Sequence, residues 1–305
     1  MAGKTMDIGK VGIWTGVLDS VPSAEAQALA QRIEALGFPT LWIPETIARD
    51  PFVTATLLLS ATTKLKIATG IANIYARDAL TMANTQRSLE EAFPGRFLLG
   101  LGVSHEHLVD RVRHHDYSKP YSAMVKYLDD MDNALFMGVG PAERPATVLA
   151  ALGPKMLTLA GEKADGAHPY FVPVEHTAQA REILGPDRVL IPEQKVYLGT
   201  DPEQAHQVAR RMARTYLALP NYTKALSRFG LDDSDLTGEG SERFLDQAVI
   251  WGSDEEIRAG VDAHLDAGAD QVAVQILPLD PTEHLPREEW RHLAAILMPS
   301  RSSSS

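Results

Sequence analysis

The sequence predicts an α/β protein folded as a TIM-type (β/α)8 barrel, a closed ring of parallel strands with helices outside it. Short apolar runs alternate with segments of helical spacing, in units of ~30 to 40 residues, and this repetition is typical of a parallel sheet. The length of 305 residues suits one barrel, and no linker rich in Pro, Gly or Ser divides the chain. A doubly wound sheet with a second domain is the competing architecture.

The first half of the chain contains four strand–helix units. Ser23 is read as the N-cap of the first helix, which stops at Gly37. Asp50 followed by Pro51 predicts the start of the second helix. The expected strands are 11–14, 40–44, 66–71 and 97–101, and the expected helices are 24–36, 51–62 and 79–93.

The second half is less regular. Ser253 followed by acidic residues predicts a helix start, and Pro192 interrupts the seventh strand. Segment 220–240, which has many charges and glycines, is read as an insertion. The expected strands are 145–151, 165–170, 189–198 and 270–276, and the expected helices are 154–162, 202–217, 254–267 and 288–297. We therefore expect a single domain over residues 8–298, with an insertion in its C-terminal half, and a flexible tail over 299–305.

Composition excludes several classes of function. The net charge of −11 argues against binding to nucleic-acid backbones, which needs a basic face. The chain has no cysteine, so disulfides, thiolate nucleophiles and cysteine metal sites are excluded. No apolar run is long enough to span a membrane, and residues 1–7 lack the apolar core of a signal peptide. We therefore expect a cytoplasmic protein with a small-molecule substrate and no nucleic-acid or membrane partner.

The stretch 95–105 predicts where the functional site lies. Its apolar part, 97–101, reads as a buried parallel strand, and Gly102 allows a sharp turn or a close approach to a ligand. Polar residues follow at once, among them Ser104 and His105. A parallel strand delivers such residues to its carboxyl edge, where barrels place their sites.

Six short motifs occur in the order found in one known family. They are 36–38 with 41–45, 68–71, 95–102, 150–156, 164–166 and 267–270. Together they resemble the bacterial luciferase-like monooxygenase superfamily, over about residues 8–298. Within it, segments 73–78 and 115–120 are similar to the deazaflavin (coenzyme F420)-dependent oxidoreductases.

This resemblance implies a TIM barrel that binds F420, or alternatively FMN, with the ring at the carboxyl ends of the strands. The turn Gly70-Ile71 would form a non-prolyl cis peptide behind the ring, and 151–156 would hold the phosphate at a helix N-terminus. Arg77, Lys119 and Lys163 are candidate cations for the acidic tail of the cofactor. Tyr117 is a candidate pocket wall. The expected cofactor contacts are Trp14, Gly70, Ile71, Asn73, Ser104, Ala151, Leu152, Gly153, Pro154, Lys155 and Met156.

The expected catalytic residues are His105 and Glu45. Many F420-dependent relatives carry an acidic residue followed by a histidine after the second strand, but this chain has Glu45-Thr46 there. His105 could replace the missing group, since the pKa of histidine lies near working pH. Glu45 could transfer a proton if burial raised its pKa, or simply accept hydrogen bonds from the ring or an amide.

The resemblance therefore predicts an F420-dependent oxidoreductase that moves a hydride between the deazaflavin and a small organic substrate. An FMN-dependent monooxygenase on the same barrel is the first alternative. A metal-dependent barrel hydrolase is another, with ligands drawn from His105, His107, His114, His115 and His168, although we expect no metal site. The missing histidine also leaves open a non-catalytic cofactor-binding protein. Relatives are often dimers, so a homodimer is compatible with the resemblance.

Overall fold

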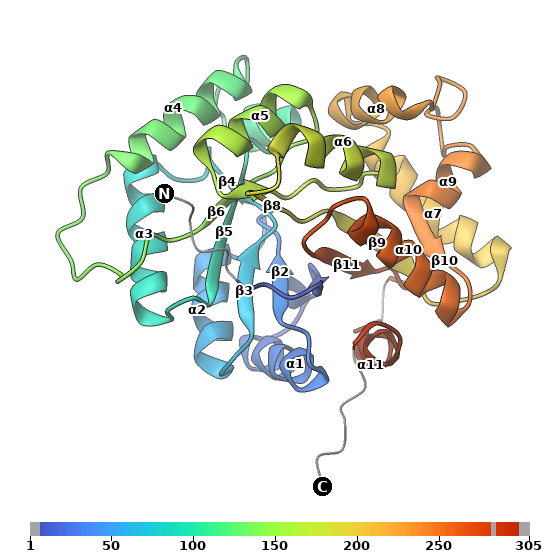
Figure 1. Ribbon diagram of the computed structural model, residues 1–305, viewed down its shortest axis with the longest axis horizontal. Helices are drawn as coiled ribbons and strands as arrows, with labels where there is room; N and C mark the ends of the chain where they lie inside the picture. Colours follow the sequence, from blue (N-terminus) through green and yellow to red (C-terminus); the bar gives the residue numbers. More distant parts are fainter. Residues whose placement is uncertain (1–6, 282–284, 299–305) are drawn as a thin grey trace, which may run out of the picture.

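In the computed structural model, which describes residues 7–281 and 285–298, parallel strands form a barrel surrounded by helices (Figure 1). Every strand pairing is parallel among the residues described. The predicted fold class is confirmed. The expected tail, 299–305, lies outside the described residues.

The first half folds as four strand–helix units in the expected order. The strands are β1 (Val11–Trp14), β2 (Thr40–Ile43), β3 (Lys66–Thr69) with the short β4 (Ala72–Asn73), and β5 (Phe97–Gly102). The helices are α1 (Ser23–Leu36), α2 (Pro51–Ala61), α3 (Ala79–Ala92) and α4 (Pro120–Asp132), with a 3-10 turn at Val17–Ser20 and a π-helix at His107–Val112.

The predicted helix signals hold at two of the three positions. The Asp50 side chain caps α2 by accepting hydrogen bonds from the amides of Phe52 and Val53. Gly37 ends α1 with a φ of 98°. The N-cap predicted at Ser23 is wrong, because α1 begins one residue earlier than expected. Pro22 occupies the N-cap, so Ser23 is the first helical residue.

The second half closes the ring. Its strands are β6 (Thr147–Leu149), β7 (Gly166–Ala167), β8 (Val189–Leu190), β9 (Glu193–Tyr197), β10 (Val249–Trp251) and β11 (Val272–Ile276). β8 pairs with β7, whereas β9 pairs with β11, and β11 pairs with β1. Pro192 stands between β8 and β9 and accepts a hydrogen bond from the Ala273 amide. The segment 189–197 therefore changes its pairing partner at Pro192, from β7 before the proline to β11 after it. This is the position of the predicted interruption.

The helices of this half are more numerous than expected. They are α5 (Pro154–Lys163), α6 (Val174–Leu184), α7 (Pro202–Tyr216), α8 (Pro220–Leu226), a 3-10 turn at Ser227–Phe229, α9 (Glu242–Ala248), α10 (Asp254–Asp266) and α11 (Arg287–Leu297). Ser253 caps α10 in a complete capping box, as predicted. Helices α6, α8 and α9 and strand β10 were not predicted from the sequence.

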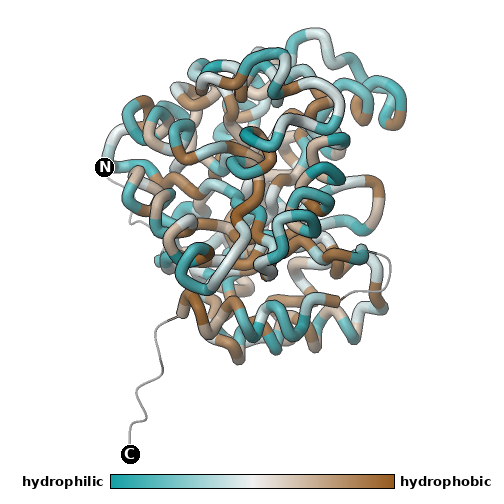
Figure 2. Tube along the Cα trace, turned by 90° about the vertical axis from the view of Figure 1, so that its right-hand side faces the viewer, coloured by the Kyte–Doolittle hydropathy of each residue, from teal (hydrophilic) through white to brown (hydrophobic). Residues whose placement is uncertain are grey.

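The expected insertion, segment 220–240, contains α8, which packs with α7 and α9 as a layer at one side of the barrel. We call this whole layer the insertion. α7, α8 and α9 lie together there (Figure 1), and their apolar residues form a cluster separate from the main core. Phe171 and Tyr197 join this cluster from the barrel. In the hydropathy-coloured trace the outer helices alternate between hydrophilic and hydrophobic residues (Figure 2). The insertion thus forms a second wall beside the rim of the barrel.

Candidate active site

The carboxyl ends of six neighbouring strands surround a cavity of about 310 Å³. Trp14 lines it from β1, and Glu45, Gly70 and His168 follow β2, β3 and β7. On the other side Tyr222 of α8 closes it. This rim is where barrel enzymes build their sites, and a concave, mostly apolar cavity is the usual form of a small-molecule site.

Most of the residues expected at the site line this cavity. They are Trp14, Glu45, Gly70, Ile71, Ser104, His105, Ala151, Leu152 and Met156, together with the expected wall residue Tyr117. The other four, Asn73, Gly153, Pro154 and Lys155, are not among its lining residues. The Asn73 side chain instead accepts a hydrogen bond from the Tyr75 amide. Gly153 to Lys155 form the start of α5, just beyond the cavity.

The floor of the cavity is built around Gly70. The Gly70–Ile71 peptide is cis, as the resemblance implies. The indole Nε1 of Trp14 donates a hydrogen bond to the Gly70 carbonyl at 3.2 Å. A Cβ on Gly70 would lie 2.5 Å from Trp14 Nε1 and 3.1 Å from His168 Nε2. Only glycine fits here without displacing these groups, because it lets the indole and the imidazole approach the backbone this closely.

One ring nitrogen of His168 lies beside this floor and has no hydrogen-bond partner among the described residues. Its Nδ1 lies 2.7 Å from the Ile191 carbonyl oxygen, which can only accept, so Nδ1 carries the proton. Burial lowers the pKa of His168 to about 4, so the ring is neutral at pH 7. Nε2 is then an acceptor, and within the described part of the chain it has no hydrogen-bond partner. The ring is held by stacking on Trp42 at 4.2 Å between centroids.

Glu45 is an acceptor held by several donors. Its oxygens accept two hydrogen bonds from the Arg77 guanidinium, at 2.9 and 2.7 Å, and one from the Asn73 amide at 2.7 Å. The carboxylate side chain is only 5% exposed. This geometry matches the accepting role that the sequence left open. Two of the expected tail cations form ion pairs within the protein. Arg77 pairs with Glu45 and Asp50, and Lys163 pairs with Asp129.

His105 faces the cavity from the loop after β5. Its ring centroid lies 5.9 Å from that of Tyr222, across the gap between the barrel and the insertion. Burial lowers the pKa of His105, so the neutral imidazole prevails near pH 7. A neutral imidazole has one donor and one acceptor nitrogen, so it can donate a hydrogen bond to a bound substrate or take a proton from it.

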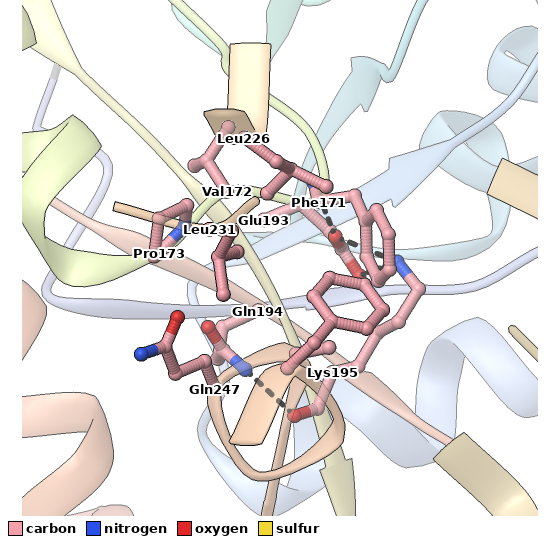
Figure 3. A pocket seen from close by; sticks show the side chains of 11 residues that line it. Phe171, Val172, Pro173, Glu193, Gln194, Lys195, Leu226, Leu231 and Gln247 are labelled. Carbon is pink, nitrogen blue, oxygen red and sulfur yellow. Dashed lines mark hydrogen bonds and ion pairs between the residues drawn. The ribbon is translucent and has the colours of Figure 1, made fainter. Parts of the chain in front are cut away.

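A buried ion pair supports the aromatic wall on the insertion side. The Lys195 ammonium donates to both oxygens of Glu193 at 2.9 Å, and neither side chain is exposed. The ammonium also lies 3.9 Å from the ring centroid of Tyr170, which lines the main cavity. Figure 3 shows this pair beside a small second cavity between the barrel and the insertion. The Tyr216 hydroxyl donates to that of Tyr170, at 2.8 Å.

Comparison with known proteins decides the family. A family model described as luciferase-like monooxygenase matches residues 10–271. The chain belongs to this family. The resemblance seen in the sequence motifs is therefore confirmed.

Relatives of this luciferase-like chain include 5,10-methylenetetrahydromethanopterin reductase of Methanolobus tindarius. It is 26% identical over 87% of this chain and 93% of the relative. Two solved structures match with a TM-score of 0.75, each covering 95% of this chain and 99% of the other. One is an F420-dependent secondary alcohol dehydrogenase in complex with an F420-acetone adduct, at 13% identity. The other is the coenzyme F420-dependent tetrahydromethanopterin reductase from Methanopyrus kandleri, at 18% identity.

Several lining residues of the luciferase-like barrel were not predicted from the sequence. Tyr170, Tyr216, Asn221 and Tyr222 line the cavity, and the last three come from the end of α7 and from α8. His168 was considered only as a metal ligand. It lies inside the strand expected over 165–170, whereas β7 ends at Ala167, so His168 directly follows the observed strand end at the rim.

The histidines of this luciferase-like barrel are not arranged as a metal site. Across residues 7–281 and 285–298, no group of three or more His, Cys, Asp or Glu side chains is placed to hold a metal ion. Over the same ranges, no helix is long and apolar enough to cross a bilayer. The histidines named for a hydrolase therefore offer no geometric support for that alternative.

Buried neutral histidines make the stability depend on pH. Burial lowers the pKa of His168, His176 and His264 to about 4, against 6.5 for the unfolded residue. Below pH 6.5 the unfolded chain binds protons that the folded chain does not bind until about pH 4. We expect each histidine to lower the free energy of unfolding by about 2 kcal/mol between pH 7 and pH 5.

Urea unfolding at the two pH values measures this effect. Replacing His264, which lies 2.9 Å from Gln194 Oε1, with glutamine should reduce the difference between pH 7 and pH 5. The exposed His107, replaced by glutamine, is the control and should leave the difference unchanged. Equal free energies of unfolding at pH 7 and pH 5 in the unmodified protein would contradict the expectation.

Proposed function

We propose that this chain is an F420-dependent oxidoreductase that transfers a hydride between the deazaflavin and a small organic substrate. The observation that carries the proposal is the cavity at the carboxyl rim of a luciferase-like barrel, with the cis Gly70–Ile71 peptide in its floor. Two solved structures with the same fold support it, because both proteins are F420-dependent enzymes. Cytoplasmic localisation and assembly as a homodimer remain part of the proposal.

The residues at the floor fit the ring of the cofactor. A Cβ on Gly70 would collide with Trp14 and lie close to His168, so the glycine lets these two rings pack against the backbone of the floor. His168 Nε2 is a buried acceptor without a donor beside this floor. A pyrimidine-type ring carries an N–H at its edge and is a fitting partner for such an acceptor. Tyr117 and Tyr170 add aromatic surface to the same cavity.

The start of α5 fits the phosphodiester of the cofactor. Gly153 is the N-cap of this ten-residue helix, and a helix N-terminus presents free amides to an anion. The Arg228 guanidinium, from the turn after α8, lies beside it, with Nη1 3.4 Å from the position of a Cβ on Gly153. Arg228 has no acidic partner among the described residues. Lys155 is exposed at the same helix start. We therefore expect the phosphate tail here rather than at Arg77 or Lys163.

The mechanism divides between the cofactor and the protein. When bound, a deazaflavin supplies the carrier that gives or takes two electrons as a hydride. The protein would hold the ring at the Gly70 floor, which is lined also by Trp14, itself fixed by its hydrogen bond to the Gly70 carbonyl. The neutral His105 would take the proton of the substrate when a hydride leaves the substrate, and in the reverse direction the imidazolium would return this proton, so that hydride and proton balance. Glu45, fixed by Arg77, keeps the strand ends around the ring in place.

Titration of the protein with F420 and with FMN tests the proposal. We expect the fluorescence of F420 to be quenched on binding at micromolar or lower concentration, and FMN to bind far more weakly. Tight binding of FMN without binding of F420 would instead favour the monooxygenase alternative. Turnover of any substrate with bound F420 would dispose of a purely cofactor-binding role.

Replacing Arg228 with alanine should weaken F420 binding about tenfold, because one charge-assisted contact to the phosphate is lost. The deazaflavin riboside, which lacks the phosphate tail, should bind the variant as tightly as the unmodified protein. Arg258 is exposed on α10 and its replacement by alanine is the control. An equal loss of affinity for both ligands would place the effect of Arg228 at the ring and not at the phosphate.

A further inference from the structure

Among the described residues, those that line the main cavity carry no free charge near neutral pH, and this restricts the substrate. Its lining includes neither lysine nor arginine, and its one carboxylate, Glu45, is bound by Arg77. Burial lowers the pKa of both lining histidines and raises the pKa of Tyr117 to about 12. A charged substrate would therefore be buried here without a counter-ion, which is strongly unfavourable.

Most hydrogen-bond donors of the cavity are already used by the protein. The Tyr117 hydroxyl donates to the Ser104 carbonyl at 2.9 Å. The Tyr216 hydroxyl donates to Tyr170, whose own hydroxyl donates to Gln275 Oε1 at 2.8 Å. The Trp14 indole donates to the Gly70 carbonyl. These donors shape the cavity but are not free to recognise a ligand.

Several polar side chains of the cavity, Thr46 and Ser104 among them, make no hydrogen bond within the described part of the chain, and three others meet on the side of the insertion. Considering the described residues only, the His105 imidazole, the Asn221 carboxamide and the Tyr222 hydroxyl make no hydrogen bond to the protein, and all three line the cavity. His105 comes from the barrel and the other two from α8, so they meet across the gap between the two layers. Leu108 and Leu152 add apolar surface to the same cavity.

We infer that the substrate is an uncharged compound with an apolar body and one oxygen that accepts hydrogen bonds, and that Tyr222 and Asn221 hold this oxygen opposite His105. The inference rests on the proposed function, because it assigns the space left when the cofactor ring occupies the Gly70 floor. The inference assigns the cofactor tail and the substrate to different places according to their charge. The anionic cofactor tail lies at Gly153 and Arg228, outside the cavity, while the substrate space accepts a neutral molecule.

Three probes of similar size and different charge test the inference on the protein saturated with F420. They are acetophenone (neutral carbonyl), benzoate (anion) and benzylammonium (cation), each titrated at pH 7 while the F420 spectrum and ligand NMR signals are followed. We expect acetophenone to bind at least about tenfold more tightly than either ion. A preference for an ion, or no detectable binding of acetophenone at millimolar concentration, would overturn the inference.

A Tyr222→Phe variant removes only the hydroxyl proposed to hold the substrate oxygen. We expect it to weaken acetophenone binding about threefold or more, the usual effect of one lost neutral hydrogen bond. Tyr121, which is 41% exposed on α4, provides the matched control as Tyr121→Phe and should leave acetophenone binding unchanged. An unaltered affinity in Tyr222→Phe would overturn the assigned contact.

The same titrations separate this inference from the proposed function. If the unmodified protein does not bind F420, the proposed function fails first. If F420 binds and benzoate is preferred to acetophenone, the function stands and the inference about the substrate fails.

Discussion

Replacing Lys195 with methionine will lower the free energy of unfolding by about 3–5 kcal/mol. The side chains of Lys195 and Glu193 are both completely buried, and each is the other's counter-ion. Burial lowers the pKa of Lys195 and raises that of Glu193, and the attraction between the two charges opposes both shifts. Without the ammonium, a buried carboxylate remains whose negative charge is uncompensated. Urea unfolding of the variant measures the effect.

The double variant Lys195→Met with Glu193→Gln separates the charge from the packing. It should recover most of the lost stability, because no buried charge is left unpaired. Lys126→Met removes the exposed Lys126–Asp130 pair and is the control, with an expected loss below about 1 kcal/mol. If Lys195→Met proved as mild as this control, the buried pair would not be the support of the tyrosine wall that the structure indicates.

Gly70→Ala is expected to reduce the affinity for F420 by at least about tenfold, or about 1.4 kcal/mol. The new Cβ would lie 2.5 Å from Trp14 Nε1 and 3.1 Å from His168 Nε2, so the indole must move. Its movement would break the hydrogen bond from Trp14 to the Gly70 carbonyl and disturb the floor on which the ring is proposed to lie. Fluorescence titration with F420 measures the loss.

Gly16→Ala is the matched control for this substitution. Its new Cβ would meet only Pro44 Cγ, at 3.5 Å, an ordinary contact. We expect the control to bind F420 like the unmodified protein. Circular dichroism should show that both variants fold. An unchanged affinity in a folded Gly70→Ala protein would contradict the location of the ring.

The strand order of the barrel could be predicted because its signals are local. Short apolar runs bounded by glycine or proline marked the strands, and Asp50 and Ser253 marked helix starts with side chains that do cap them. Helix α6 carries no such signal, since it begins after Pro173, which has no capping side chain. β10 has only three residues and is defined by its pairing with β9, which is distant in sequence.

The site was predictable only where it depends on strand ends. Ser104 and His105 follow a strand that could be recognised, so their place at the rim followed from the fold. Tyr222 and Arg228 belong to the insertion, and their positions depend on how α8 packs against the barrel. No local pattern encodes that packing. The engagement of Arg77 by Glu45 is likewise a contact between side chains 32 positions apart.

The crystal structure of the complex with oxidised F420 tests the central claim most directly. We predict that the deazaflavin ring lies against Gly70 and Ile71, with its phosphate beside Gly153 and Arg228. A ring bound elsewhere, in the small cavity beside Lys195 or in the surface groove formed by α2 and α3, would contradict it.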